Sequence, residues 1–311
     1  MEITNIMNLP RSIVYALESQ NYDKGKSDYS VTELISPAFQ NALKIAHSAY
    51  IKEDASDRIW ALLGSSVHYI IAQAHREEEN SFAEKRIYMP FMDKTISGQF
   101  DLFQDGILTD FKVTSAWAVK DGPKDDWVAQ LNLLDLLLNF QRGIRVEKLQ
   151  IVAILRDWSE TTRKKNPDWY PRKPIKVIDI EMWDRKTQKA YLQDRIEKHE
   201  DVRFYLTGKG ADRWKDVWEG LVCTPEERWR KPHTWAVNKV GVKRALKLYK
   251  ENEHVNAEEQ ALDFCDHKNE EAGDGEKEYY VQYRPGEDTR CESYCPVSNH
   301  CPYYQHSYIG V

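Results

Sequence analysis

The chain has 311 residues, enough for one large domain or two smaller ones, and its 41% hydrophobic and 30% charged content is ordinary for a globular protein. It contains no run of about 18 apolar residues, which argues against a membrane span, and its N-terminus lacks the pattern of a secretory signal. The net charge of −6 does not favour nucleic-acid binding but does not exclude it, because a phosphate-binding groove needs only local basic residues.

In chain order, residues 29–34 open a helical segment and residues 57–75 form a stronger helix. Apolar residues recur in that second helix at helical spacing and are expected to face the core: Trp60, Leu63, Val67, Ile70 and Ala74. Alternating or short apolar runs predict strands at 83–91, 100–102, 107–113, 149–155 and 177–182. Helices are predicted at 124–140 and 187–206, and a loop at 161–174.

The composition changes beyond about residue 215. Tryptophan, proline and charge increase there, residues 266–278 are acidic and loop-like, and three cysteines lie near the C-terminus. We therefore expect a core over residues 1–214 and a C-terminal extension over residues 215–311. The fold class that we expect is mixed α+β, with a mixed β-sheet flanked by helices.

The sharpest motif combines Asp101 with Asp110 and Lys112. Alternate residues of a strand share a face, so Asp110 and Lys112 are expected to point one way, while Phe111 and Val113 point into the core. A turn around residues 104–106 would form a hairpin and bring Asp101 beside them. The plain alternative for one Asp-x-Lys pair is a surface salt bridge on a hairpin.

Phosphodiester hydrolysis needs this combination of side chains. Two carboxylates hold Mg²⁺ or Mn²⁺ through hard oxygen ligands, and the metal activates water and neutralises charge in the transition state. A lysine can orient or deprotonate the water, or stabilise the developing charge.

The pattern Gly98-x-x-Asp101 followed by Asp110-x-Lys112 resembles the core motif of PD-(D/E)XK nucleases. Within that superfamily it is similar to the RecB-like and CRISPR-associated exonucleases, including phage versions. Their upstream Gly-x-x-x-His helix matches Gly64 to His68 here. The resemblance implies a restriction-endonuclease-like core, with His68, Asp101 and Asp110 as metal ligands. Taken alone, His68 would be read as an ordinary helix histidine.

Two more positions match this family. Glu84 corresponds to an acidic residue that opens the first core strand, and Gln130 to a glutamine that contacts the active site or the substrate. Four residues after Gln130 the family usually has a tyrosine, whereas this chain has Leu134. The resemblance covers residues 28–156 well and the remainder loosely.

The cysteines suggest a second centre. Cys291, Cys295 and Cys301 are separated by three and five residues, and thiolates this close bind zinc or an iron–sulfur cluster. A similar C-terminal trio in RecB-like exonucleases joins an earlier cysteine around a [4Fe–4S] cluster, which this resemblance favours over Zn²⁺. The first gap is one residue longer here, and no cysteine precedes the core. Cys223, Cys265 or His300 would supply the fourth ligand, and we favour Cys223; three unligated thiols are the alternative.

Two basic stretches are candidates for DNA contacts. The first combines basic and aromatic side chains that could follow phosphates and stack on exposed bases: Arg163, Lys164, Lys165, Trp169, Tyr170, Arg172 and Lys173. The second places Lys239, Lys243 and Lys247 at helical spacing beside Arg244. A solvated charged surface is the alternative for both, and for the second stretch it is favoured.

Together these features predict a Mg²⁺- or Mn²⁺-dependent deoxyribonuclease that acts on DNA in recombination, repair or phage DNA processing. Exonucleolytic cleavage is favoured over an endonuclease of the same fold and over a non-catalytic DNA-binding subunit. With no signal sequence and no regular disulfide spacing, we expect a reducing compartment, the cytoplasm of a bacterial or phage-infected cell.

Overall fold

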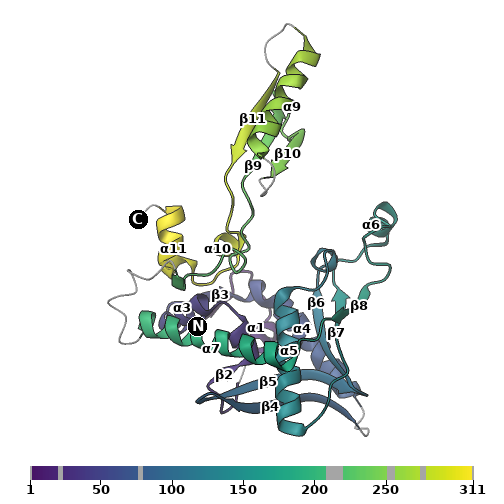
Figure 1. Cartoon of the computed structure of the whole chain (residues 1–311), viewed down its shortest axis with the longest axis vertical. Coiled ribbons are helices and arrows are strands. Elements are labelled where there is room, and N and C mark those ends of the chain that lie inside the picture. The colour runs from purple at the N-terminus through teal and green to yellow at the C-terminus, as the bar shows by residue number, and fades with distance from the viewer. Residues whose placement is uncertain are drawn as a thin grey trace. The chain divides into compact units, whose positions relative to one another are not determined.

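The computed structural model describes residues 2–19, 24–75, 80–207, 220–250, 256–273 and 278–309. The chain divides into two compact units, Met1–Leu221 and Val222–Val311, which follow one another along the colour bar of Figure 1. The expected boundary between residues 214 and 215 lies outside the described residues. No helix in the described part of the chain is both long enough and apolar enough to cross a membrane.

Short elements lead into the first unit. They are β1 (Glu2–Thr4), α1 (Arg11–Glu18), β2 (Tyr29–Ser30), α2 (Val31–Ile35), α3 (Ala38–Ala46) and β3 (Lys52–Asp54). The expected helical segment at 29–34 is thus a two-residue strand followed by α2. The Ser30 side chain caps this helix by accepting a hydrogen bond from the Glu33 backbone N–H at 3.1 Å.

The centre of the unit is a mixed sheet in the order β2-β5-β6-β7-β8, with β4 paired to β5 (Figure 1). Its longer strands are β4 (Ser81–Phe91), β5 (Lys94–Gln104), β6 (Ile107–Thr114), β7 (Lys148–Leu155) and β8 (Ile175–Ile180). The β6–β7 pair is parallel, whereas β4–β5, β5–β6 and β7–β8 are antiparallel. The mixed sheet expected from the sequence is confirmed.

The turn between β5 and β6 also follows the expectation. Asp105 and Gly106 both have positive φ, at 48° and 82°. A two-residue loop with two left-handed residues joins twisted antiparallel strands without splaying them, and Asp-Gly is a preferred sequence for it. Gly98, the first residue of the motif that contains Asp101, lies within β5.

Helix α5 (Asp125–Arg142) crosses the sheet and fills the core. Leucines are buried on all its sides, because the sheet covers one side, and α2 and α7 (Arg185–Thr207) contact it as well. A buried polar network ties the helices together: Asp135 accepts hydrogen bonds from Arg185 at 2.7 Å and from Gln188 at 2.9 Å. These helices confirm the predictions at 124–140 and 187–206.

Helix α4 (Ile59–Ala74) is the helix predicted at 57–75, preceded by the short η1 (Ala55–Arg58). The prediction that the apolar stripe of this helix faces the core is wrong. Trp60 is 55% exposed and Ile70 64% exposed, and no residue of the helix is buried. The main contacts of α4 in the described chain are with β6, α1 and η1. Helical periodicity shows that an apolar stripe exists, but not that a partner covers it.

The second unit contains a small antiparallel sheet of β9 (Thr234–Lys239), β10 (Lys247–Lys250) and β11 (Tyr279–Arg284) with α9 (Ala257–Ala272) packed on it. Short helical elements follow: α10 (Thr289–Ser293), η3 (Ser298–His300), α11 (Pro302–Tyr304) and η4 (Gln305–Ile309).

Three local predictions need correction. The stretch 161–174 is not all loop, because Ser159 caps the short helix α6 (Glu160–Lys165). Residues 266–272 belong to α9, which Asn256 caps and which ends before Gly273, so this part of the expected acidic loop is helical. Lys239 and Lys247 lie on paired strands, not on one helix, because a reversal of the chain at Gly241 (φ 79°) favours a hairpin.

Candidate active site

The site begins where β5 and β6 diverge. These strands pair only between Leu102–Gln104 and Ile107–Thr109, after which β6 continues along β7. Just beyond the last pair, the Phe111 N–H donates a 2.7 Å hydrogen bond to Asp101 Oδ2. A side chain thus replaces the strand partner that this N–H lacks, and the bond fixes the Asp101 carboxylate at the fork.

His68 and Glu84 complete a cluster around Asp101. His68 Nδ1 lies 3.3 Å from Asp101 Oδ1 and 3.6 Å from Glu84 Oε1. The ring of His68 also meets Phe111 edge-on at 6.4 Å. One potential ligand atom from each of the three residues lies within 4.8 Å of the other two, the only such group among the described residues.

Glu84 has an unusual backbone. Its φ is 49°, a left-handed conformation that non-glycine residues rarely adopt within a strand. Phe82 and Ile87 both pack in the main core, although regular alternation would place residues five apart on opposite faces. The paired strand β5 changes face in the same way, since Phe100 and Phe103 are both buried in that core. Glu84 therefore occupies a strained position opposite Asp101, and such strain is common at functional sites.

The cluster has the electrostatics of a cation site. Like charges directly opposite in a sheet destabilise it, so two facing carboxylates need a positive partner. Hydrogen bonds to Asp101 and Glu84 raise the pKa of His68 to about 10, overcoming the opposing effect of burial. A proton on His68 therefore supplies the positive charge. One imidazole nitrogen and two carboxylates are also a ligand set that suits Mn²⁺, and the carboxylates suit Mg²⁺.

Asp110 and Lys112 lie beside this cluster on the opposite side of β6 from Phe111. Lys112 Nζ is 2.8 Å from Asp110 Oδ2 and 2.9 Å from Gln130 Oε1 on α5. Asp110 is 2% exposed. The expectation that Phe111 and Val113 face the core is therefore wrong, because the α5 side is the more buried one and the acid–lysine pair faces it.

Burial and the mutual attraction of the two charges act against each other in this pair. Burial raises the pKa of Asp110 to about 6, against the opposing effect of Lys112. Burial alone would lower the pKa of Lys112, but the Asp110 carboxylate outweighs it and the net shift is upward. Although Asp110 Oδ2 is close to Nζ, it receives no aligned hydrogen bond. One buried carboxylate oxygen thus retains capacity for a further ligand.

Of the residues selected from the sequence, His68, Glu84 and Asp101 converge directly. Asp110, Lys112 and Gln130 form a second cluster, and Asp101 and His68 are close enough to affect the pKa of Asp110. Asp110 is not among the three residues whose ligand atoms lie within 4.8 Å. Gly64 has open space where a side chain would begin. Leu134, at the position of the family tyrosine, is buried in the core and packs near Gly98.

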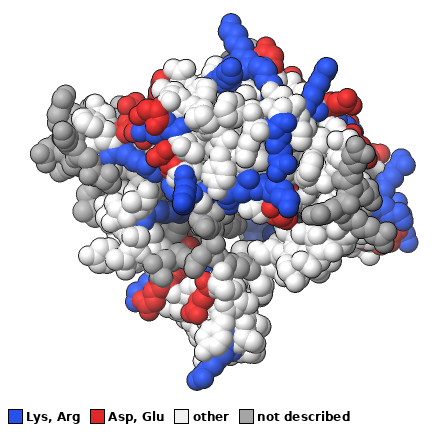
Figure 2. Space-filling model, turned by 90° about the horizontal axis from the view of Figure 1, so that it is seen from below, with Lys and Arg blue, Asp and Glu red and all other residues white. Residues whose placement is uncertain are grey.

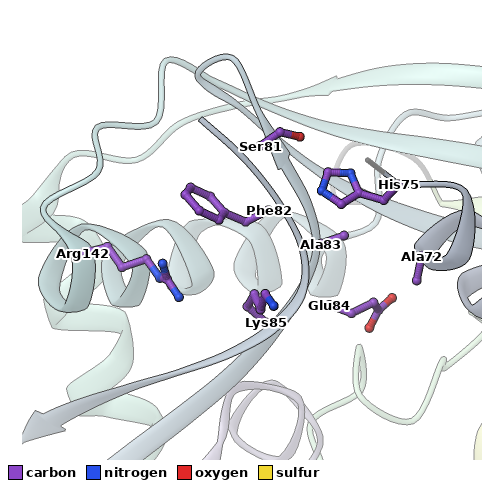
Figure 3. A pocket seen from close by; sticks show the side chains of 8 residues that line it. All are labelled: Ala72, His75, Ser81, Phe82, Ala83, Glu84, Lys85 and Arg142. Carbon is purple, nitrogen blue, oxygen red and sulfur yellow. The ribbon is translucent and has the colours of Figure 1, made fainter. Parts of the chain in front are cut away.

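A cavity of about 700 Å³ opens beside Glu84 (Figure 3). Its lining comes from the end of α4, the start of β4 and the end of α5: Ala72, His75, Ser81, Phe82, Ala83, Glu84, Lys85 and Arg142. The Arg142 guanidinium lies 5.0 Å from the centre of the Phe82 ring. Two buried lining atoms, Ser81 Oγ and His75 Nε2, have no hydrogen-bond partner among the residues that the structure describes. The cavity thus offers cationic, aromatic and free polar groups next to the carboxylate cluster.

Apart from Glu84, the sequence analysis did not identify the residues that line this cavity. Ser81, His75 and Arg142 carry no motif, and they come together only because α4, β4 and α5 end near one another. The sequence offered one signal for this cavity, Arg142 at the end of the apolar helix α5.

The first basic stretch is less available for DNA than expected. Tyr170 is buried, and its hydroxyl contacts the Ser159 N–H and the Asp157 carbonyl, so it cannot stack on a base. Trp169 packs on Trp117 with ring centres 4.4 Å apart, and Arg163 is paired with Glu160 at 2.6 Å. The remaining basic residues of the stretch are exposed: Lys164, Lys165, Arg172 and Lys173.

Basic side chains nevertheless gather locally. Figure 2 shows Lys and Arg in a band across one face of the molecule, with most Asp and Glu nearer its margins. A net charge of −6 therefore leaves room for local attraction of phosphates.

The four cysteines of the predicted second centre approach one another in the second unit. The pKa of Cys223 and that of Cys291 are both raised to about 12, chiefly by burial, and the nearby thiols of Cys295 and Cys301 contribute to both shifts. Cys265 lies elsewhere, in the core between α9 and β9. It packs there as a small apolar residue and is not the neighbour of the trio.

A buried ion pair holds the segments that carry these cysteines. Asp288 is fully buried and lies 3.2 Å from Arg228 and from Arg230, and it accepts a hydrogen bond from Tyr303 at 2.7 Å. Arg228 also donates to the Cys223 carbonyl. The start and the end of the unit are thus joined through charged and hydrogen-bonded groups around the thiols.

Comparison with known proteins adds little. No family model and no curated protein matches the chain. The crystal structure of SSO0001 is similar to it with a TM-score of 0.43 and 17% identity, covering 68% of this chain and 93% of that one. A crystal structure from Eubacterium rectale named "Putative exonuclease" has a TM-score of 0.26 and 12% identity, covering 66% and 73%. Both TM-scores are too low for any functional inference.

Proposed function

We propose that the chain is a metal-dependent deoxyribonuclease and that His68, Glu84 and Asp101 hold its divalent cation. The observation that carries the proposal is the convergence of one ligand atom from each residue within 4.8 Å. The buried pair of Asp110 and Lys112 beside this cluster supplies a further carboxylate and a fixed positive charge. Such a set of groups is suited to hydrolysis of a phosphodiester.

Bound Mg²⁺ or Mn²⁺ would polarise the scissile phosphate and lower the pKa of a water molecule. The protein's own groups position the substrate around it. Asp110 and Gln130 hold the Lys112 ammonium from two sides, so its charge is fixed before substrate arrives. That ammonium stabilises negative charge as it develops on the phosphate or orients the attacking water. Phe111 fixes the Asp101 carboxylate through its backbone N–H.

We infer exonucleolytic cleavage from the cavity beside Glu84. Its volume of about 700 Å³ is within the usual range for a small-molecule site and accommodates one nucleotide. Arg142 and Lys85 offer charge for a phosphate, and Ser81 Oγ, which has no partner in the described part of the chain, offers a hydrogen bond. A pocket for a single nucleotide next to the metal ligands suits an enzyme that removes residues from a strand end.

The test is cleavage of linear and covalently closed circular DNA with Mn²⁺ and with a chelator. Wild-type protein is expected to degrade linear DNA only when metal is present and to leave the circle intact. Asp101→Asn is expected to abolish cleavage, whereas Asp105→Asn, the same change at an exposed turn position that tolerates asparagine, is expected to retain it. A cut circle would show an endonuclease. DNA binding without metal-dependent cleavage would leave only a DNA-binding protein.

We further propose that Cys223, Cys291, Cys295 and Cys301 hold a [4Fe–4S] cluster in preference to zinc. A tetrahedral zinc site with Zn–S bonds of about 2.3 Å draws its thiolates to within about 4 Å of one another. No three of the described cysteines share the 4.8 Å spacing of His68, Glu84 and Asp101. A cluster needs wider spacing because its own iron and sulfide atoms lie between the ligands. Backbone N–H groups of Tyr303 and Tyr304 donate to Cys301, which suits a thiolate ligand.

Anaerobic purification followed by iron, sulfide and zinc analysis tests this second centre. Absorbance near about 400 nm with matching iron and sulfide supports the cluster. Stoichiometric zinc would replace it with a zinc site, and absence of both metals would leave four unligated thiols.

A further inference from the structure

The small sheet of the second unit has two different faces. Helix α9 covers one of them, where Val237 packs with Ala261 and Cys265. Residues directly opposite in neighbouring antiparallel strands share a face. The other face therefore carries three parallel rows: Lys250–Thr234–Arg284, then Leu248–Ala236–Gln282, then Asn238–Tyr280.

This second face retains exposed side chains that a buried sheet would cover. Leu248 is 50% exposed and Tyr280 48% exposed. The amide of Asn238 is buried in the middle of the face and binds Gln282 and Arg284 across the strands, at 3.3 and 3.4 Å. The face thus combines an exposed aromatic ring, an aliphatic side chain, an amide network and an arginine.

Charge is segregated between the strands and the helix. From residue 234 to residue 250 the sequence has five basic residues and no acidic one: Lys239, Lys243, Arg244, Lys247 and Lys250. Helix α9 has six acidic residues and one Lys or Arg: Glu258, Glu259, Asp263, Asp266, Glu270 and Glu271, with Lys268. The acidic groups therefore lie on the helix layer, and the strand layer with its connecting turn is positive.

The positive charge borders a hollow. A cavity of about 650 Å³ is lined by the β9–β10 turn, the start of β10 and β11, with four basic side chains and no acidic one: Lys243, Arg244, Lys247 and Arg284, with Ala245, Leu246 and Leu248. Lys247 extends toward Phe264 on the α9 side, 4.8 Å from the ring centre. Lys243, Arg244 and Arg284 remain as the cationic groups around the hollow on the uncovered face.

We propose that this face, defined by Lys243, Arg244, Arg284, Leu248 and Tyr280, binds the phosphate backbone of DNA. Cationic groups without acidic neighbours attract phosphates, and the adjacent tyrosine and amide groups are suited to sugars and base edges. The identification of the polyanion as DNA rests on the proposed nuclease function. The anion site itself rests on the basic residues of the second unit and is independent of that proposal. The second unit then adds affinity for the substrate that is separate from the metal-ligand cluster.

The test is DNA binding by the full chain in chelator, where cleavage is blocked. Anisotropy of a labelled linear duplex is measured over a series of NaCl concentrations for wild type and for Lys243→Glu/Arg244→Glu. The matched control is Lys231→Glu/Lys268→Glu, which changes the net charge equally in the same unit but away from the hollow. Thermal melting of both variants confirms that they fold.

The double reversal in the turn is expected to weaken binding at least about tenfold at low salt and to reduce the salt slope by about 2, since two phosphate contacts are lost. The control is expected to retain most of the affinity and the slope. Equal losses in the two variants would show that net charge alone matters, and an unchanged affinity in the turn variant would show that the face does not bind DNA; either result overturns the inference. Metal-dependent cleavage by wild type reports separately on the proposed function.

Discussion

Replacing Gly98 by alanine is expected to destabilise the first unit. A Cβ at this position would lie 2.5 Å from Leu134 Cδ2, 3.2 Å from a Val31 methyl and 3.4 Å from Leu137 Cδ2. Carbon atoms normally approach to about 3.5–4.0 Å, so the first contact is about 1 Å too short. Leu134 is 1% exposed and Leu137 fully buried, so neither has free space to move into.

Two effects of opposite sign decide the magnitude. Overpacking a core costs about 1–3 kcal/mol, whereas replacing glycine stabilises by about 0.4–1 kcal/mol through the unfolded state. The expected net loss is about 1–2 kcal/mol, because the clash is with buried branched side chains. For a unit of this size that lowers Tm by about 2–8 °C. Gln130 lies one helical turn before Leu134, so a displaced α5 would also disturb its bond to Lys112.

Thermal or urea unfolding of three variants measures the effect. Gly98→Ala is compared with Gly64→Ala, where a Cβ meets nothing within 4 Å and helix propensity favours alanine, so Tm is expected to rise slightly. The effect of Gly98→Ala is also measured in a Leu134→Ala background. That background lacks the Leu134 methyl that makes the shortest contact, so Gly98→Ala is expected to change Tm little there. An unchanged Tm for Gly98→Ala, or the same loss in both backgrounds, would refute the packing argument.

Other predictions concern pH, the buried pair and the thiols. Burial lowers the pKa of His199 from 6.5 to about 4, so the folded state binds its proton less well than the unfolded state. The contribution of His199 to the free energy of unfolding is then full above pH 6.5 and falls by up to about 3 kcal/mol as the pH drops toward 4. His199→Gln is expected to remove this part of the pH dependence. Identical pH profiles of stability for wild type and His199→Gln would contradict the prediction. Lys112→Met is expected to lower cleavage at least about 100-fold. It also lowers Tm, because Asp110 becomes a buried unpaired acid, and adding Asp110→Asn is expected to restore Tm but not cleavage. Cys223→Ser is expected to lose bound metal and to speed proteolysis of residues 223–301 while Cys265→Ser retains the metal; equal metal content in both would exclude Cys223 as a ligand.

The sequence was sufficient for most of the sheet, because every strand except β2 carries a short apolar or alternating run. Asp105-Gly106 is a good example, since two consecutive left-handed residues fit very few structures other than a tight hairpin. The sequence did not predict how α4 is buried. Trp60 and Ile70 belong to a clear apolar stripe, yet the structure leaves both side chains exposed. Periodicity identifies a stripe, whereas burial depends on tertiary contacts that sequence spacing does not encode.

The same limit applies to the site. Asp101, Asp110 and Lys112 could be selected because strand parity and residue chemistry are local properties. The side of the strand that each residue occupies could not be predicted. Phe111 is apolar and yet faces His68, while Asp110 and Lys112 are buried under α5. The strained conformation of Glu84 was also invisible in the sequence, since a glutamate gives no sign of a positive φ. The turn at Gly106 could be predicted, because glycine favours a positive φ.

Direct Mn²⁺ binding is the most immediate test of the central claim that His68, Glu84 and Asp101 hold a divalent cation. Titration of Mn²⁺ into the chain is followed by electron paramagnetic resonance, which reports free and bound ion separately. One equivalent is expected to bind to wild type and to Asp105→Asn, whereas Asp101→Asn and Glu84→Gln are each expected to weaken binding at least about tenfold, in line with the loss of one carboxylate ligand. Equal Mn²⁺ affinity in all four proteins would contradict the assignment, since the ion would then bind elsewhere on the chain.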